Sequence, residues 1–213
     1  MELIDSLVQS NWLKTSTIID AFRKIERKDF LLEDSKNLAE IDEALSIGYG
    51  QTISQPLVVA FMLELLQPRE GESIMDIGFG SGWTTALLSE IVGSKGKVIS
   101  IEIVPKLAEF GRKNITKYGF IEKGIAECYC RDATDGYPEL KTGFDRILAS
   151  ASIQEEDGKS IDSVPIAWKQ QLKVGGRIVT PINDSIWLFE KMAQDKFKEK
   201  EYHGFTFVPL ISK

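Results

Sequence analysis

The sequence contains very little histidine and cysteine, the side chains that most protein metal sites require. His203 is the single histidine among 213 residues, and Cys128 and Cys130 are the two cysteines. Three such ligands cannot complete the usual zinc set without carboxylates or a second chain, so we predict no metal site. Two cysteines separated by one residue lie too close along a strand for an ordinary disulfide. We interpret them as buried thiols of a protein from a reducing compartment.

Long apolar runs and an excess of basic residues are also absent. No stretch approaches the roughly 18 uncharged apolar residues of a membrane span, and the first residues lack the pattern of a signal peptide. These absences predict a cytoplasmic protein with no membrane partner. The net charge of −6 argues against nucleic acid as a partner, because duplex-binding proteins usually carry a basic face. We expect a monomer.

The first part of the chain has a helical periodicity that is then lost. Apolar residues recur at helical spacings up to about residue 35, and residues 36–56 are rich in Gly, Ser and Gln. We therefore predict that residues 1–56 form N-terminal helices followed by an ordered loop across the top of the next domain.

From residue 57 onward, helices alternate with short apolar strands. The predicted strands are 73–77, 97–102, 126–130, 144–150 and 177–181, with helices at 57–66, 82–92, 105–118 and 163–172. This alternation predicts an α/β fold, a doubly wound and mainly parallel sheet with helices on both faces. Residues 187–192 and 205–210 are predicted to add an antiparallel pair at one edge, with a solvated loop at 194–201. Residues 57–213 then form one compact unit around a seven-stranded sheet.

A glycine-rich turn follows the first of these strands and precedes a helix. Asp76, Gly78, Gly80 and Gly82 form the pattern acid-x-Gly-x-Gly-x-Gly, and Trp83 follows. Such turns in a doubly wound sheet bind nucleotide-like ligands. A dinucleotide site needs a small residue where Trp83 stands, and a P-loop needs Gly-Lys-Ser/Thr after the turn, so both are disfavoured. The pattern instead resembles motif I of class I methyltransferases, a resemblance that implies a Rossmann-like fold and S-adenosyl-L-methionine as cofactor.

Two more acids follow the next two predicted strands. Glu102 ends the second strand, and a carboxylate at this place can accept both ribose hydroxyls of an adenosyl group. We predict that the next residue, Ile103, also binds the cofactor. Asp132 and Ala133 follow the third strand, where methyltransferases typically contact the adenine ring and its amino group. Three acids at the ends of successive strands favour S-adenosylmethionine over a chance arrangement.

The segment 47–56, Ile-Gly-Tyr-Gly-Gln-Thr-Ile-Ser-Gln-Pro, resembles the signature of protein-L-isoaspartate O-methyltransferases. Residues 21–30, 102–108, 175–181 and 207–210 resemble other stretches of this family, in the same order along the chain. The resemblance implies methyl transfer from S-adenosylmethionine to the α-carboxylate of L-isoaspartyl residues. The substrates are damaged proteins and peptides, and the cofactor product is S-adenosyl-L-homocysteine.

The resemblance also assigns roles within the signature. Ser54 aligns with a serine close to the reacting carboxylate. Thr52 and Ile53 align with residues that lie against the cofactor, and the resemblance implies that Ser54 also contacts the cofactor. A carboxylate is ionised at neutral pH, so the reaction needs no strong general base. It needs oxygen, methyl carbon and sulfur held in line. We therefore predict that Ser54 is catalytic by orienting the substrate and not by acting as a nucleophile.

The segment after the fourth predicted strand departs from the family pattern. Where the family has a Thr-Ala-Ala run, residues 149–152 read Ala-Ser-Ala-Ser, and a longer acidic loop around 154–157 follows, including Glu155 and Asp157. This loop keeps open a methyltransferase of the same fold that acts on another peptide or on a small carboxylate. A non-catalytic adenosyl-binding protein that docks a partner is a second alternative, although the intact acids and Ser54 argue against it.

Overall fold

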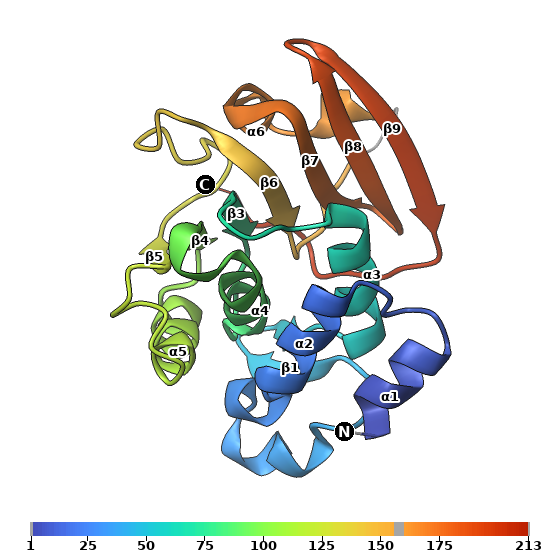
Figure 1. Cartoon of the computed structure of the whole chain (residues 1–213), viewed down its shortest axis with the longest axis vertical. Helices are drawn as coiled ribbons and strands as arrows, with labels where there is room; N and C mark the ends of the chain where they lie inside the picture. The colour runs from blue at the N-terminus through green and yellow to red at the C-terminus, as the bar shows by residue number, and fades with distance from the viewer. Residues whose placement is uncertain (1, 156–159, 213) are drawn as a thin grey trace.

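The computed structural model describes residues 2–155 and 160–212, which are built around a seven-stranded sheet of order β5-β4-β3-β6-β7-β8-β9 (Figure 1). Neighbours from β5 to β7 pair in parallel, and the last two pairs are antiparallel. The predicted α/β fold with a mainly parallel sheet is confirmed. The strands are β3 (Ser73–Ile77), β4 (Lys97–Glu102), β5 (Ala126–Cys130), β6 (Phe144–Ala149), β7 (Leu172–Ile182), β8 (Ser185–Ala193) and β9 (Lys196–His203).

The antiparallel edge differs from the prediction. Most of the stretch 194–201 lies in β9 and is not a loop, whereas 205–210 forms no strand beyond one bridge between Pro209 and Ser152. β9 is the last strand of the sheet, so one of its sides has no neighbouring strand. Charged side chains such as Lys198 and Glu199 are compatible with such an edge. Polarity at this place therefore does not indicate a loop.

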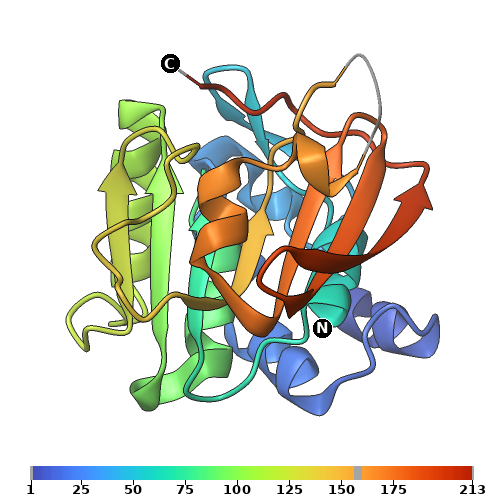
Figure 2. The same ribbon diagram turned by 90° about the horizontal axis from the view of Figure 1, so that it is seen from above.

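Side chains of the parallel strands alternate between two cores, one on each face of the sheet. Ile74 and Val98 belong to one core, and their neighbours Met75 and Ile99 belong to the other. Helices on both faces bury these side chains, and Figure 2 shows α6, in orange, across the sheet from the N-terminal helices in blue. The helices over the sheet are α3 (Pro56–Leu66), α4 (Trp83–Val92), α5 (Pro105–Thr116) and α6 (Ile166–Gln171), with 3-10 turns at Gly93–Lys95 and Ile161–Ser163.

Two helix predictions need comment. The helix predicted at 163–172 is shorter, because β7 already begins at Leu172 and the preceding turn is a separate 3-10 element. None of the described helices combines the length and the apolar character that crossing a bilayer demands.

The N-terminal helices pack onto the same face as α3 and α4. α1 (Glu2–Gln9) and α2 (Ser16–Lys24) lie beside these helices in Figure 1, and their apolar side chains join the same core. Phe22 of α2 meets Trp83 of α4 edge to face, with 5.6 Å between ring centroids. Trp83 therefore faces the N-terminal helices, and it stands at the start of α4, directly after the glycine-rich turn.

The segment predicted to be an ordered loop contains a small hairpin. Short 3-10 turns at Arg27–Phe30 and Glu33–Leu38 lead to β1 (Leu45–Gly48), which pairs antiparallel with β2 (Gln51–Ile53). The tip at residues 48–50 has positive φ angles throughout, which its two glycines adopt without strain. These strands are only four and three residues long, which is too short for a periodic pattern to reveal them in the sequence.

The two cysteines lie in β5 and form no disulfide, as predicted. Cys128 is buried, but Cys130 is exposed at the end of the strand, so the prediction of two buried thiols is wrong for Cys130. The reason is that β5 is the other edge of the sheet and Cys130 is its last residue.

Candidate active site

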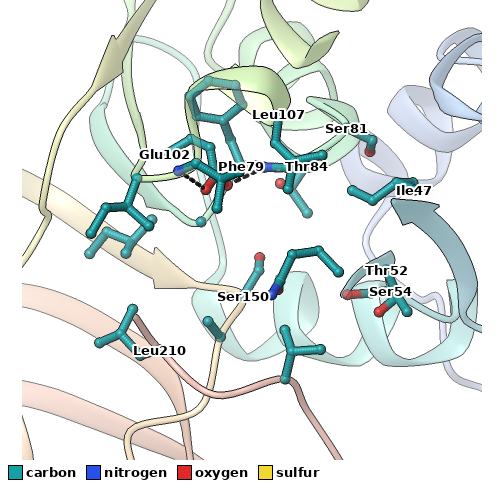
Figure 3. A pocket seen from close by; sticks show the side chains of 18 of the residues that line it. Ile47, Thr52, Ser54, Phe79, Ser81, Thr84, Glu102, Leu107, Ser150 and Leu210 are labelled. Carbon is teal, nitrogen blue, oxygen red and sulfur yellow. Dashed lines mark hydrogen bonds between the residues drawn. The ribbon is translucent and has the colours of Figure 1, made fainter. Parts of the chain in front are cut away.

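A cleft opens at the carboxyl ends of β3, β4 and β6, where the chain switches from one side of β3 to the other. Doubly wound sheets bind ligands at this position. The cleft and its open mouth together contain about 750 Å³ of space, part of which is open to solvent. Figure 3 shows Glu102 and Thr84 on one side of it, with Thr52 and Ser54 facing them.

Two walls enclose this cleft. The loop wall consists of residues 77–81, 83–84, 101–104, 131 and 133, and the hairpin wall consists of residues 47, 51–54, 150–151 and 208–211. Three predicted site residues, Asp76, Gly82 and Asp132, do not line the cleft. The predicted residues that do line it are Thr52, Ile53, Ser54, Gly78, Gly80, Glu102, Ile103 and Ala133.

The three glycines of the turn have different tasks. Gly78 and Gly80 line the cleft with positive φ angles of 72° and 46°, so the backbone reaches the ligand space without a side chain in between. Gly82 has a φ of 89° and lies behind the wall, where an added Cβ would come within 2.8 Å of the carbonyl oxygen of Gly111 in α5. Gly82 therefore permits the close packing of α4 on α5, and a contact with the cofactor stays a prediction.

Glu102 is fixed in the loop wall by backbone donors. Its side chain is buried, and Oε2 accepts a hydrogen bond from the amide of Gly80 at 3.0 Å. Oε1 accepts one from the amide of Val104 at 2.9 Å. A carboxylate has about four lone-pair positions, so both oxygens retain acceptor capacity for hydroxyl groups in the cleft. The predicted ribose contact is compatible with this geometry.

Asp76 lies beneath the loop wall and is fully buried. Its Oδ2 accepts hydrogen bonds from Thr84 Oγ1 at 2.9 Å and from Thr85 Oγ1 at 2.6 Å. Among the described residues, Oδ1 has no hydrogen-bond partner. Burial raises the pKa of Asp76 to about 6, although the two threonine hydroxyls oppose this shift. Asp76 thus organises the first turn of α4, and Thr84 carries this arrangement into the cleft.

The turn after β5 places a backbone strip on the cleft. Asp132 Oδ1 accepts hydrogen bonds from the amide and the hydroxyl of Thr134, at 2.8 Å and 2.7 Å, which fix the turn. Ala133 lines the cleft, and its carbonyl accepts a hydrogen bond from Trp168 Nε1 of α6 at 2.7 Å. Arg131 also lines the cleft, with its guanidinium 4.6 Å from the ring centroid of Tyr137.

The hairpin wall brings together segments that are far apart in the sequence. Ser54 follows β2, and Ser150 follows β6, where its amide donates to the carbonyl of Ile77 at 2.9 Å. In Figure 3 the Ser150 side chain points into the space between Ser54 and the loop wall. The C-terminal segment closes this wall through two hydrogen bonds, from Ser152 N to Val208 O at 2.8 Å and from Leu210 N to Ser152 O at 2.7 Å.

Only the beginning of the predicted acidic loop is described. The amide of Glu155 donates to Asn183 Oδ1 at 3.0 Å, and Asn183 Nδ2 donates to the carbonyl of Glu155 at 2.8 Å. The rest of the predicted loop, 156–157, lies outside the described residues. Within 2–155 and 160–212, no three His, Cys, Asp or Glu side chains gather as ligands of a metal ion would.

The sequence as a whole has clear relatives. Residues 1–213 match the family model described as Protein-L-isoaspartate(D-aspartate) O-methyltransferase. The chain belongs to this family. A protein-L-isoaspartate O-methyltransferase of Methanopyrus kandleri is 36% identical over 99% of this chain and 90% of that protein. The protein-L-isoaspartate O-methyltransferase 2 of Archaeoglobus fulgidus is 39% identical over 91% of this chain and 84% of that protein.

The fold of this protein-L-isoaspartate O-methyltransferase family member is also shared with a solved structure. A Plasmodium falciparum protein, described as a protein-L-isoaspartate O-methyltransferase in complex with S-adenosyl-L-homocysteine, aligns with a TM-score of 0.83 at 20% identity. The alignment covers 99% of this chain and 97% of that one. The predicted family and the Rossmann-like methyltransferase fold are confirmed.

Several lining residues of this family member were not predicted from the sequence. Thr84, Arg131 and Ser150 line the cleft, as do Val208 and Leu210 of the C-terminal segment. Thr84 had a usable signal, because it stands in the first helical turn after the glycine-rich turn and donates a hydrogen bond to Asp76. The others depend on which distant segments meet at the cleft, and that is not visible in a local pattern.

Proposed function

We propose that the protein transfers a methyl group from S-adenosylmethionine to the α-carboxylate of L-isoaspartyl residues in damaged proteins and peptides. One observation carries this proposal: the Ser54 hydroxyl and the Glu102 carboxylate line the same cleft from opposite walls. The family membership of the chain supports the substrate, and the geometry of the loop wall supports the cofactor.

The loop wall fits an adenosyl cofactor. Glu102 keeps acceptor capacity for the ribose hydroxyls, while Gly78 and Gly80 let the backbone approach without side chains. We assign Ile103 and Ala133 to the adenosyl part of the cofactor and Thr52 and Ile53 to its other side. When bound, S-adenosylmethionine supplies an electrophilic methyl group on a sulfonium cation and leaves as S-adenosylhomocysteine. Asp76 acts through Thr84, and Asp132 fixes the turn that carries Ala133.

The hairpin wall supplies orientation. The substrate carboxylate is already ionised at neutral pH, so no side chain has to remove a proton. Within the described residues, the Ser54 hydroxyl makes no hydrogen bond to another protein group, so it is available to donate one to the carboxylate. A strong hydrogen bond would stabilise the ground state, so the benefit of Ser54 lies in direction and not in binding strength. Ser54 thus places one carboxylate oxygen for attack.

An assay with paired peptides tests the proposal. An isoaspartyl peptide and its aspartyl twin are incubated with labelled S-adenosylmethionine, and we expect label only in the first. Methylation of neither peptide, with cofactor binding intact in calorimetry, would contradict the isoaspartyl substrate and favour another peptide or a small carboxylate. Failure to bind the cofactor would contradict methyl transfer altogether.

Ser54→Ala tests the residue assignment. We expect kcat to fall by about tenfold to a hundredfold, because the carboxylate loses its orienting donor, with the cofactor Kd unchanged within about twofold. Ser46→Ala is the matched control, since its hydroxyl lies in the other strand of the hairpin and accepts only the amide of Gly48. A fully active Ser54→Ala enzyme would remove Ser54 from the mechanism.

The remaining assignments concern the whole molecule. We propose that residues 1–56 are a helical and hairpin extension that covers the site, and that residues 57–213 are the methyltransferase domain. We also propose that the protein works as a monomer in the cytoplasm, without nucleic acid or membrane partners. Gel filtration with light scattering tests the monomer, and a particle of twice the chain mass of 23.9 kDa would contradict it.

A further inference from the structure

A single buried arginine holds the base of the β1–β2 hairpin. Arg27 lies in the 3-10 turn after α2 and is only 6% exposed. Its guanidinium donates to four backbone carbonyls that belong to two separate stretches of chain. The acceptors are Ala39 at 3.3 Å and Ile41 at 2.9 Å from Nη1, and Glu43 at 2.6 Å and Ser54 at 3.3 Å from Nη2.

Two of these carbonyls flank the hairpin. Glu43 precedes β1 and Ser54 follows β2, so the Nη2 atom of Arg27 joins both ends of the hairpin at one point. A second tie lies beside it, where Asp42 Oδ1 accepts the amide of Leu57 in the first turn of α3 at 2.8 Å. The tip has no such support, and Tyr49 there is 63% exposed. The position of Ser54 is therefore set at the base of the hairpin and not at its tip.

The same guanidinium also contacts the element that carries the cofactor turn. It lies 5.5 Å from the ring centroid of Trp83, the first residue of α4. Trp83 directly follows Gly82 and lines the cleft. Arg27 thus donates to the backbone of Ser54 in the hairpin wall and lies over the ring of Trp83 in the loop wall.

Burying this cation is costly, which makes its geometry informative. Burial lowers the pKa of Arg27 to about 10, with Asp42 acting in the opposite direction, so the side chain stays charged at neutral pH. A buried charge is tolerated when it is hydrogen-bonded, and the two Nη atoms of Arg27 make four such bonds, while its Nε has no partner among the described residues. The planar fork of arginine can serve several carbonyls in fixed directions, whereas the ammonium of lysine is a point charge on a flexible stem.

We propose that Arg27 is a positioning residue for methyl transfer, setting the place of Ser54 relative to the glycine-rich turn. The proposal rests on the methyl-transfer function proposed above. Arg27 contacts neither reactant, so it acts on kcat through Ser54 and leaves the affinity for the cofactor almost unchanged.

Two substitutions and one control separate positioning from simple stability. Arg27→Met removes all four hydrogen bonds, and Arg27→Lys keeps the charge with a different geometry. Tyr118→Phe is the control, because the Tyr118 hydroxyl accepts from the amide of Glu26 at 3.0 Å and donates to Asp29 Oδ2 at 2.8 Å. It secures the same 3-10 turn from the side of α5 without contacting Ser54.

We expect Arg27→Met to lower kcat by about tenfold or more, with the cofactor Kd within about threefold. Arg27→Lys should recover part of kcat, and Tyr118→Phe should lower the melting temperature while keeping kcat within about twofold. All rates are compared at a temperature where each variant is folded. Equal losses of kcat in Arg27→Met and Tyr118→Phe, or a parallel loss of cofactor affinity, would overturn the proposal.

Hydrogen exchange gives a readout that does not depend on the methylation assay. In the Arg27 variants, the amides of residues 43–54 should exchange at least about fivefold faster than in the parent protein, while Tyr118→Phe should leave them unchanged. Unchanged exchange in Arg27→Lys and Arg27→Met would refute the positioning role of Arg27 even if both variants were inactive. An inactive parent protein with the expected exchange pattern would instead refute the proposed function, while the role of Arg27 in fixing the hairpin would still hold.

Discussion

The loop wall and the hairpin wall of the cleft are held together in different ways. In the loop wall, Glu102 binds the amides of Gly80 and Val104, so neighbouring strand ends fix one another. In the hairpin wall, Ser54 is held through its carbonyl by Arg27, and the C-terminal segment is held through Ser152. One wall is built from consecutive turns of a sheet, and the other from segments that meet only in the folded chain.

The two walls therefore differ in which contacts fix the positions of their site residues. Backbone bonds within a parallel sheet leave little freedom, so changes in the loop wall should act on folding and cofactor affinity. In the hairpin wall, one arginine donates to several carbonyls, so the position of this wall depends largely on a single side chain. Changes there should act on turnover, as the tests of Ser54 and Arg27 are designed to show.

The largest contrast is expected between two glycines, one behind the loop wall and one at the tip of the β1–β2 hairpin. Gly82→Ala forces a side chain into a φ of 89° and to within 2.8 Å of the carbonyl of Gly111, so α4 must move away from α5. We expect it to lower the free energy of unfolding by about 3 kcal/mol or more. Gly50→Ala at the hairpin tip has a φ of 72° but nothing within 4 Å, so about 1 kcal/mol is expected. Chemical denaturation measures both, and equal losses would contradict the contrast.

The next effect concerns cofactor affinity at the loop wall. Glu102→Ala leaves the amides of Gly80 and Val104 without their acceptor and removes the carboxylate from the cleft. We expect the cofactor Kd to rise by about tenfold to a hundredfold, the range for lost hydrogen bonds to a charged group.

Glu102→Gln is the control for this experiment, since its carbonyl can replace only one of the two oxygens as an acceptor. It should give an intermediate Kd in calorimetry. A cofactor affinity that is unchanged in Glu102→Ala would show that Glu102 serves only the fold of the turn.

The smallest predicted effect is a dependence of stability on pH. The pKa of Asp76 is about 6 in the folded protein and near the ordinary aspartate value of 3.8 in the unfolded chain, so the native state holds the proton more tightly. Stability from this group is therefore present at low pH and is lost as the pH rises through about 6. Relative to Asp76→Asn, the parent protein should lose roughly 2 kcal/mol between about pH 4.5 and about pH 7.5.

Urea unfolding of both proteins at the two pH values measures this difference without cofactor. Because all other titrating groups are common to the pair, the difference isolates Asp76. Identical pH dependence of stability in the two proteins would mean that folding does not raise the pKa of Asp76.

The parts that could be predicted from the sequence are those with local causes. The glycine-rich turn and Glu102 follow from a strand, a turn and a helix in succession, and Gly78, Gly80 and Glu102 line the cleft. The role of Gly82 in helix packing could not be predicted in the same way, because Gly111, which it contacts, lies in another helix. Arg27 looks like any surface residue of an amphipathic helix, and only the folded chain brings four carbonyls to it.

The strand β9, first expected to be a loop, has a consequence for how copies of the protein behave in crowded solution. An open sheet edge presents unpaired amides and carbonyls on which another polypeptide can add a strand. Here that edge carries exposed Lys196, Lys198, Glu199 and Lys200. Adding a strand would bring further chain against these charges and strip them of water. The residues that hide the strand from a sequence reading thus protect the sheet from growing between molecules.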